Sequence, residues 1–591
     1  MYKELLKSWC NAMLDLQIKE SKQERIEGGI MCPSCMRIHG RSADAMFPML
    51  TMYKLTGDKK YLESAKMLFD WSEHMVRPDG SYNNDTNSNW NGITVFAAIQ
   101  LGECLSNYKE IIEKEVYQKW YDRFVISATY IKDNIEQIGG NINYPVTASH
   151  AMAIAYELTQ DKSFAQKAKV LADFAVTHIT EDGLLYGEGH NWQEVTPKGC
   201  RPIDMGYNVE ESIPALISYA EMMKDKNIME IAVRIAKKHM EFIMPDGGLD
   251  NSFGSRSYKW SYWGSRTSDG CQAGFAHLAK QDHDFAEVIY RNTRLLAQCT
   301  HDGLLYGGPM YYEAKEPPCV HHTICHAKAL AHLVAHDVYP KGGNLLPIER
   351  VDGVIKYPSI AAYKIVKNDW YATITEYDCV YTPGGHPTGG SIGLLWNRQF
   401  GPVMAGTMEE YRQVEPNNMQ MPKYQFDINT TPRIEKRIGK QVYTSSMDLS
   451  AFLTVKDKGE NGVKARAAGQ LRNISQQNAG GYELRYKIKA DFEIKGFSLS
   501  DEAVFIFPIA LSSTNTNWKL DGNTFVAEKE KCRISIQASE TIWIPDEYIG
   551  ADKSVRRLIN PIGGFEMLPL RISLKRGEEF DVIIKMDKIK K

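Results

Sequence analysis

Histidine, arginine, tyrosine and tryptophan gather in six short segments within the first 340 residues, and each segment follows a glycine. The spacing recurs, because one residue of this set stands ten positions after its glycine in three segments (39−29, 90−80 and 150−140). The six glycines are Gly29, Gly80, Gly140, Gly183, Gly247 and Gly303. Polar and aromatic groups that converge in one place are the usual mark of a binding or active site, so we expect one shared pocket.

This residue set suits an acidic sugar. Tryptophan presents a flat face to a sugar ring, and arginine binds a carboxylate with two parallel hydrogen bonds. Tyrosine and histidine can move a proton at the carbon beside a carboxylate once a cation neutralises that carboxylate. The expected reaction is therefore β-elimination at a uronate, within an acidic oligo- or polysaccharide.

Roles follow from residue type. We expect Tyr207 and His150 to be the proton-transfer pair, with the choice of base and acid left open, and Arg266 or Arg41 to bind the carboxylate. Sugar-binding and supporting groups are expected among the remaining members of the six segments. These are His39, Trp90, Asn91, His190, Arg256, Trp260, Tyr262, Trp263, His321 and His322.

Two other functions fit the same segments. A glycoside hydrolase needs two opposed carboxyl groups, for example Asp85 and Asp204, although several of the acidic residues here stand where helices begin and can cap free N–H groups instead. A non-catalytic glycan-binding protein would use the aromatic pocket alone. We rank elimination above both alternatives.

A metal site is a weaker possibility, and no cofactor is expected. Cys32 and Cys35 have the C-x2-C spacing of half a zinc site, His39 follows closely, and Cys319 with His321 or His322 could complete it. A single CxxC pair is a weak signal, and we rank a structural zinc above a catalytic one. The pair His322 and His326 has metal-binding spacing but lacks the glutamate of an HExxH motif.

Helices must position these segments. Apolar residues recur with helical spacing over the first 340 residues, for example at Phe164, Ala168 and Leu171. We expect each glycine to end an outer helix as a left-handed C-cap, before the chain returns through an inner helix. Six such pairs closed on themselves make an (α/α)6 toroid; an open solenoid of the same pairs is the alternative.

Strands replace helices beyond about residue 350, where apolar and polar residues alternate, as in ELRYKIKADFEIK. The Gly- and Pro-rich stretch HDVYPKGGNLLPIERVDG separates the two halves. We predict a toroid domain over 1–340 that carries the site and an antiparallel β-sandwich over 341–591 that supplies no proton-transfer group.

Composition excludes several classes of partner. The 591 residues carry 70 Lys+Arg and 73 Asp+Glu, a net charge of −3, so nucleic acid and anionic membranes are poor partners. Eleven cysteines without paired spacing predict no disulfide framework. The first residues contain no apolar stretch of signal-peptide quality, although a chain whose leader had been removed would look the same. Nothing indicates an oligomeric state.

The segments CPSCMRIHGRSADAMFP, NWNG, GEGHNWQE, DMGYNVEES and YWGSRTSDG resemble the L-rhamnose-α-1,4-D-glucuronate lyases, family 27 of the polysaccharide lyases. That family belongs to the broader group of lyases with a toroid and a β-sandwich. The resemblance implies exo-removal of terminal L-rhamnose from arabinogalactan-type glycans, an unsaturated glucuronate product, and a periplasmic or cell-surface location in a gut bacterium. The NNHxxxW stretch of alginate lyases is missing, and HNWQ echoes it only in part.

Overall fold

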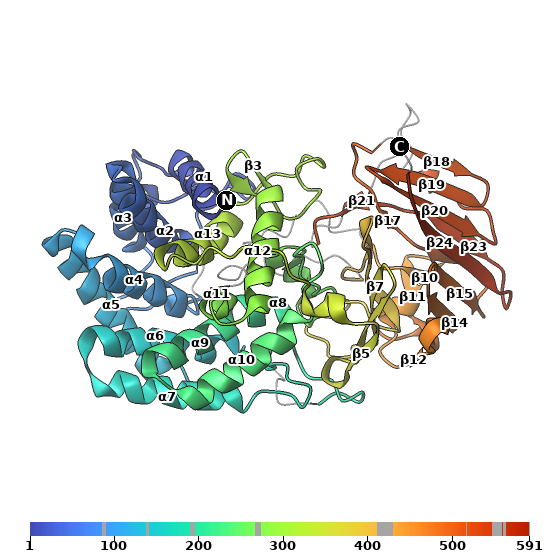
Figure 1. Cartoon of the computed structure of the whole chain (residues 1–591), viewed down its shortest axis with the longest axis horizontal. Coiled ribbons are helices and arrows are strands. Elements are labelled where there is room, and N and C mark those ends of the chain that lie inside the picture. Colours follow the sequence, from blue (N-terminus) through green and yellow to red (C-terminus); the bar gives the residue numbers. More distant parts are fainter. Residues whose placement is uncertain are drawn as a thin grey trace.

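The structure is a computed structural model of the 591-residue chain. It describes all residues except 85–89, 137–140, 190–194, 266–272, 410–428, 516, 547–557, 560–562 and 590–591. Helices fill the first part of the chain and strands the second, and the two parts lie side by side (Figure 1).

Six inner helices form a closed ring. Each packs against the next, and α13 returns to pack against α2, so the open solenoid is wrong. The inner helices are α2 (Met46–Thr56), α4 (Thr94–Tyr108), α6 (Asn143–Thr159), α9 (Ile213–Met223), α11 (Ala273–Leu278) and α13 (Val320–Ala335). The outer helices are α1 (Tyr2–Leu16), α3 (Lys59–Ser72), α5 (Lys114–Asn134), α7 (Lys162–Val176), α10 (Lys226–Met240) and α12 (His283–Gln298).

Sequence pattern explains which helices are inside. The inner helix α6 is buried almost all round, whereas outer α10 buries one stripe that includes Ile228, Ala232 and Ile235 and exposes its other side. Four outer helices begin at an aspartate whose side chain accepts a backbone N–H, which satisfies a free donor of the first turn. These caps are Asp58, Asp161, Asp225 and Asp282.

The recurring glycines lie in hairpin turns and not at the ends of the outer helices, where they were expected. Gly80, Gly183 and Gly247 have positive φ, but each lies in a tight turn several residues after the outer helix ends. In each turn the glycine N–H donates to the carbonyl three residues earlier, and the chain then pairs back on itself, as in Val76 with Tyr82. The prediction that these glycines are helix C-caps is therefore wrong; they close small hairpins.

The second part is built from antiparallel sheets. One has the order β5 (Gly353–Tyr357), β6 (Ala362–Lys367), β7 (Trp370–Thr375), β8 (Ser391–Asn397), β9 (Gly401–Ala405). A second, twelve-stranded sheet contains β10 (Arg433–Ile438), β11 (Gln441–Thr444), β12 (Phe452–Asp457), β13 (Val463–Arg472), β14 (Asn478–Ile488), β15 (Phe492–Ser498), β16 (Ala503–Ile506), β18 (Trp518–Asp521), β19 (Thr524–Lys529), β20 (Cys532–Ala538), β23 (Arg571–Leu574) and β24 (Phe580–Lys588). A small third sheet joins β17 (Ile509–Ala510), β22 (Glu566–Leu568) and β21 (Leu558–Ile559).

The five-stranded sheet lies between the ring and the large sheet (Figure 1). One of its faces, including Leu394 and Trp396, joins the hydrophobic core of the ring. Its other face, including Ile374 and Leu395, packs with the large sheet to form the core of a sandwich. The toroid followed by an antiparallel β-sandwich is the predicted fold.

Candidate active site

The six segments that precede the inner helices meet one another. Arg41, just before α2, lies 3.8 Å from the carboxylate of Glu211, just before α9, and Asn143 at the start of α6 donates to the same carboxylate at 2.6 Å. The Arg41 guanidinium also lies 4.3 Å from the ring centre of Phe96 at the start of α4. The remaining two segments join through contacts described below, so residues from all six repeats share one end of the ring.

Tyr207 is the phenol at the centre of this end. It closes the short helix α8 (Met205–Tyr207) and is followed by a π-helical turn, Asn208–Ser212, before α9 begins. Asp204 caps this start and accepts the Tyr207 N–H at 3.1 Å. Wide π turns inside helices often occur at functional sites because they re-aim side chains. Here the turn presents Tyr207 while leaving it only 6% exposed.

Two cations contact Tyr207. Lys259 Nζ donates a hydrogen bond of 2.9 Å to the phenol oxygen, and the Arg256 guanidinium lies 4.1 Å from the ring centre. Both cations come from the segment that ends in the hairpin β1 (Trp260–Ser261) and β2 (Gly264–Ser265), and both are buried. A positive donor at the phenol oxygen stabilises the phenolate, which is the form that can accept a proton.

Arg256 is also held by acids. Glu188 forms a close ion pair with it, and Asp204 Oδ2 lies 3.5 Å from its Nε. Burial raises the pKa of Glu188 to about 8, with Arg256 acting in the opposite direction. Burial also raises the pKa of Asp204. Because burial favours the protonated form of Glu188, the acids around Tyr207 balance the cations Arg256 and Lys259 only in part.

A second buried network surrounds Arg41. Its Nε lies 2.7 Å from Asp44 Oδ2, which also contacts Lys328 of α13 at 3.1 Å. Although burial opposes it, the attraction of Arg41 and Lys328 lowers the pKa of Asp44. Burial raises the pKa of Glu211 to about 7. This network carries both signs of charge and joins the first repeat to the last.

The histidines of the last segment lie at the same end. His326 Nε2 is 3.8 Å from Glu210, and the rings of His322 and Trp263 are 5.2 Å apart. The ring of His321 lies 4.9 Å from that of His39. Burial lowers the pKa of His321 well below its usual value, so it is neutral at neutral pH.

His150 lies deeper in the ring than Tyr207. It is the eighth residue of α6, about 10 Å along the helix from its start at 1.5 Å per residue. Burial lowers the pKa of His150 to about 3, and the charged groups acting on it are His277 and Lys328. Among the described contacts, none joins His150 to Tyr207. Their pairing stays a prediction.

The aromatic residues divide into exposed and buried sets. Trp90 is 48% exposed, lies 5.7 Å from Tyr144, and precedes Asn91, whose side chain donates to Tyr130 at 2.7 Å. The indole N–H groups of Trp260 and Trp263 instead donate to backbone carbonyls. Tyr262 donates to Asp246. All three are fully buried, so in this structure only Trp90 of the expected tryptophans offers an open face.

Several predicted residues lie outside the described part of the chain. They are His190, Arg266 and Asp85. Their roles stay predictions from the sequence.

Three site residues were missed by sequence reasoning. Lys259 stands between aromatic residues in SYKWSYW, and a lone charge in such a segment is a signal that could have found it. Glu188 stands between two glycines in YGEGH, and no pattern in the sequence marks it as a site residue. Tyr381 belongs to the connection between β7 and β8, yet its ring lies 5.6 Å from the Arg256 guanidinium. The sandwich therefore contributes a phenol to the edge of the site.

Sulfur ligands gather next to this site. The ligand atoms of Cys32, Cys35 and His39 all lie within 4.8 Å of one another, and Cys319 Sγ is 3.2 Å from Cys32 Sγ. This is the one group of potential metal ligands found among the described residues.

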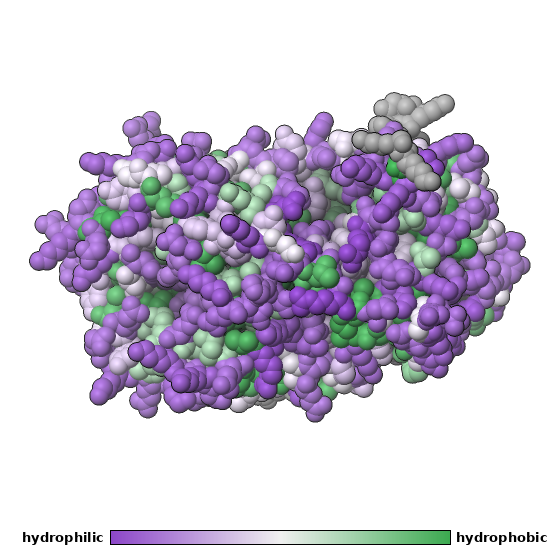
Figure 2. Space-filling model, in the orientation of Figure 1, coloured by the Kyte–Doolittle hydropathy of each residue, from purple (hydrophilic) through white to green (hydrophobic). Residues whose placement is uncertain are grey.

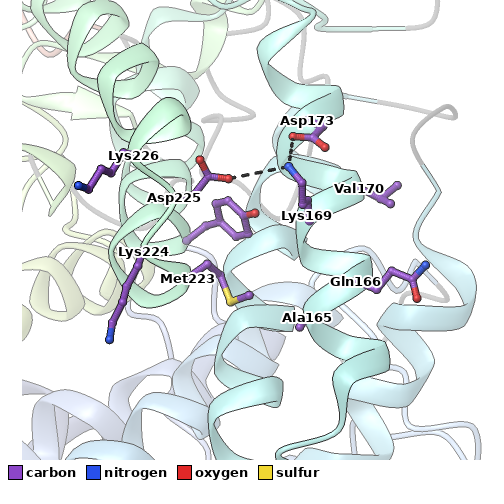
Figure 3. Close-up of a pocket in the computed structure, with 10 residues that line it drawn as sticks. Ala165, Gln166, Lys169, Val170, Asp173, Met223, Lys224, Asp225 and Lys226 are labelled. Carbon is purple, nitrogen blue, oxygen red and sulfur yellow. Dashed lines mark hydrogen bonds and ion pairs between the residues drawn. The ribbon is translucent and has the colours of Figure 1, made fainter.

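A depression on the outside of the ring is a poor alternative site. It lies between α7 and the junction of α9 with α10, and Lys169 at its wall is paired with Asp173 at 2.9 Å and Asp225 at 4.0 Å (Figure 3). Three lysines, Lys169, Lys224 and Lys226, line it against two aspartates, so only one positive charge is in surplus, and Lys169 itself is already paired. The molecular face in Figure 2 is mostly hydrophilic, with small separate hydrophobic areas.

Comparisons with known proteins agree with the fold. A family model described as the ulvan lyase N-terminal domain matches residues 6–345, and one described as the ulvan lyase C-terminal domain matches residues 354–587. A broad-specificity ulvan lyase from Formosa agariphila is 35% identical over 587 residues, covering 96% of this chain and 91% of that protein. The crystal structure of heparinase III has a TM-score of 0.58 at 11% identity, covering 93% of this chain and 77% of that one. Another heparinase III structure has a TM-score of 0.52 at 10% identity, covering 99% and 84%.

Proposed function

We propose, on the premise that the chain belongs to the ulvan lyase family, that it cleaves ulvan by β-elimination at a uronate with Tyr207 as the base. Membership makes the chain a polysaccharide lyase acting on uronate-containing polysaccharides. The hydrolase and non-catalytic alternatives are therefore set aside. The similarity to heparinase III supports the fold alone, because the identity is 11%.

The observation that carries the proposal is the hydrogen bond from Lys259 to the phenol oxygen of Tyr207. Elimination needs a base that removes the proton from C5 of the uronate, next to the carboxylate. A phenolate held by an ammonium donor is such a base, and the Arg256 guanidinium against the ring adds to its stabilisation.

In the proposed reaction the C5 proton passes to Tyr207 Oη. The electron pair of the C5–H bond forms the C4=C5 double bond, and the C4–O4 bond breaks toward the leaving sugar. The phenol formed in the first step then protonates the departing oxygen and is ready as phenolate for the next cycle. Lys259 stays a cation throughout and holds Tyr207 in position.

Charge in the site favours an anionic substrate. Burial favours the protonated form of Glu188, so acids near Tyr207 balance Arg256 and Lys259 only in part, and a uronate carboxylate would add negative charge there. Arg256, Arg41 and, from the sequence, Arg266 are the proposed carboxylate-binding groups. Neutralising this carboxylate stabilises the enolate that develops as C5 loses its proton.

The leaving sugar is a finer question. Ulvan contains rhamnose and glucuronate, so departure of a rhamnose from C4 of glucuronate agrees with both the family and the sequence resemblance. Exo-removal of terminal rhamnose from arabinogalactan stays the second candidate, because only that resemblance supports it.

No helix among the described residues is long and apolar enough to cross a bilayer. A periplasmic or cell-surface location is part of this proposal.

Digestion of three polysaccharides tests these statements. Ulvan, gum arabic and a neutral glucan are each incubated with the full chain, and the ultraviolet absorbance of the conjugated double bond and the product sizes are followed. We expect absorbance to rise with ulvan and not with the glucan. Release of free rhamnose from gum arabic, with ulvan untouched, would replace ulvan by arabinogalactan as the substrate.

A further inference from the structure

We propose that Cys32, Cys35, His39 and Cys319 bind one structural zinc ion that joins the first repeat of the ring to the last. Three of these ligand atoms lie within 4.8 Å of one another, and the fourth, Cys319 Sγ, lies 3.2 Å from Cys32 Sγ. Cys35 Sγ and His39 Nε2 are 3.4 Å apart. In a tetrahedral zinc site with bonds of about 2.0–2.3 Å, the ligand atoms lie about 3.3–3.8 Å apart. Cys319 Sγ lies outside the set of atoms that are all within 4.8 Å of one another, so as the fourth ligand it would move toward Cys35 and His39 when the metal binds.

A tight hairpin presents the first two thiols. Met31 pairs with Ile38, the Cys32 N–H donates to the Arg37 carbonyl at 2.9 Å, and the Met36 N–H donates to the Cys32 carbonyl at 3.0 Å. Met36 adopts a φ of 53°, which is rare for a residue with a side chain. This turn places Cys32 and Cys35 close together, with His39 at the end of the returning arm.

The fourth ligand comes from the other end of the ring. Cys319 is the N-cap residue of α13, and its sulfur accepts the backbone N–H of His321 at 3.3 Å. The start of a helix favours negative charge, so this position suits a thiolate. Since α13 packs against α2, a bond from Cys319 to the metal would link the first and last repeats where the ring closes.

Burial and ligand chemistry favour zinc. Cys32, His39 and Cys319 are buried, and Cys35 is partly exposed, so solvent reaches the cluster from one side only. Three thiolates and one imidazole form a closed Cys3His set, which is characteristic of structural zinc rather than of calcium or magnesium. A disulfide is the competing chemistry, but it would join two sulfurs at about 2.0 Å and leave the other two ligands unused.

The site lies beside the proposed catalytic groups without belonging to them. His39 is two residues before Arg41, and Cys319 is two residues before His321. Zinc would therefore fix the backbone on both sides of the Arg41 network. We assign it a structural role, because four protein ligands would leave no open position on the metal for water or substrate.

The test measures metal on the full chain. The wild type is purified without chelator, and zinc per chain is measured by mass spectrometry; we expect about one. Cys35→Ser is the mildest variant because Cys35 is partly exposed, and it should lose the zinc and lower the Tm. Cys532→Ser, in β20 of the sandwich, is the matched control and should keep the zinc.

A second measurement does not depend on variants. Cobalt(II) added to metal-free wild type should give the charge-transfer and visible bands of tetrahedral cobalt bound to thiolates, and added zinc should abolish them. Wild type that binds neither ion would overturn the proposal. So would a Cys32–Cys319 or Cys32–Cys35 disulfide in the intact protein, or full zinc content in the Cys35→Ser variant.

Discussion

Lys259 donates a hydrogen bond of 2.9 Å to the phenol oxygen of Tyr207, and both side chains are more than 90% buried. Burying a cation against a phenol is costly unless the pair is useful or well compensated. In the proposed mechanism the pair has a direct use, because the ammonium would keep a strong oxygen base ready beside the bound uronate.

Replacing Tyr207 by phenylalanine removes the proposed base and little else. We expect kcat to fall about 10²–10⁴-fold, the usual contribution of a general base, with Tm nearly unchanged. Tyr61→Phe is a matched control, since Tyr61 is also buried and makes one hydrogen bond, to Asn11. Steady-state kinetics on ulvan measure both. Near-normal turnover of Tyr207→Phe would remove Tyr207 from the mechanism.

The hydrogen bond from Lys259 to Tyr207 should affect how kcat/KM depends on pH. Without the ammonium the phenolate is harder to form, so Lys259→Met should move the acidic limb of kcat/KM to higher pH and lower the rate at neutral pH. Lys259→Arg, which keeps a positive donor, should move the limb less. A uniform loss of rate with an unmoved limb would mean that Lys259 only supports the fold.

Glu188 makes stability depend on pH in a defined direction. Its pKa is raised to about 8 in the folded protein, above its usual value of 4.5. Between these values the folded state holds a proton that the unfolded state has released, so stability falls as pH rises. Glu211, raised to about 7, acts in the same direction.

Glu188→Gln should therefore remove one contribution that lowers Tm as pH rises, so the Tm of the variant should gain relative to that of the wild type between pH 5 and pH 8. Glu63→Gln, on the exposed surface of α3, should leave the slope unchanged. A Glu188→Gln variant whose Tm depends on pH in the same way as that of the wild type would contradict a raised pKa of Glu188 in the folded protein.

His150 is the predicted partner of Tyr207 in proton transfer, and no described contact tests this pairing. It lies about 10 Å along α6 from the start of that helix, and its lowered pKa favours the neutral imidazole. We expect His150→Ala to lower kcat by less than about tenfold, well short of a general-base loss, with the shape of the pH profile kept. A loss as large as that of Tyr207→Phe, in a folded variant, would return His150 to the proton-transfer pair.

Much of the fold follows from local patterns. Helical and alternating periodicities placed the ring and the sandwich on the correct sides of residue 350, because burial of one face controls both patterns. Closure of the ring by α13 on α2 depends on contacts between distant residues, so the sequence left a solenoid open. The positive φ of the glycines was predictable, but the hairpins that they close were not.

The sequence predicted which segments form the site, but it predicted the places of single residues less well. Counting from the glycines found the six segments, but a fixed offset of ten residues places His39 and Trp90 before their helices and His150 inside one. Trp260 and Trp263 were read as sugar platforms, although a large apolar ring is equally suited to the core in which both are buried. Tyr381 required knowledge of how the sandwich packs on the ring.

The most direct test of the central statement follows the double bond itself. Ulvan is incubated with wild type and with Tyr207→Phe in ¹⁸O-labelled water, and the ultraviolet absorbance and product masses are recorded together. We predict absorbance that rises with wild type, unsaturated products without ¹⁸O, and almost no change with Tyr207→Phe. Saturated products that carry ¹⁸O, or equal absorbance with both proteins, would contradict elimination by Tyr207.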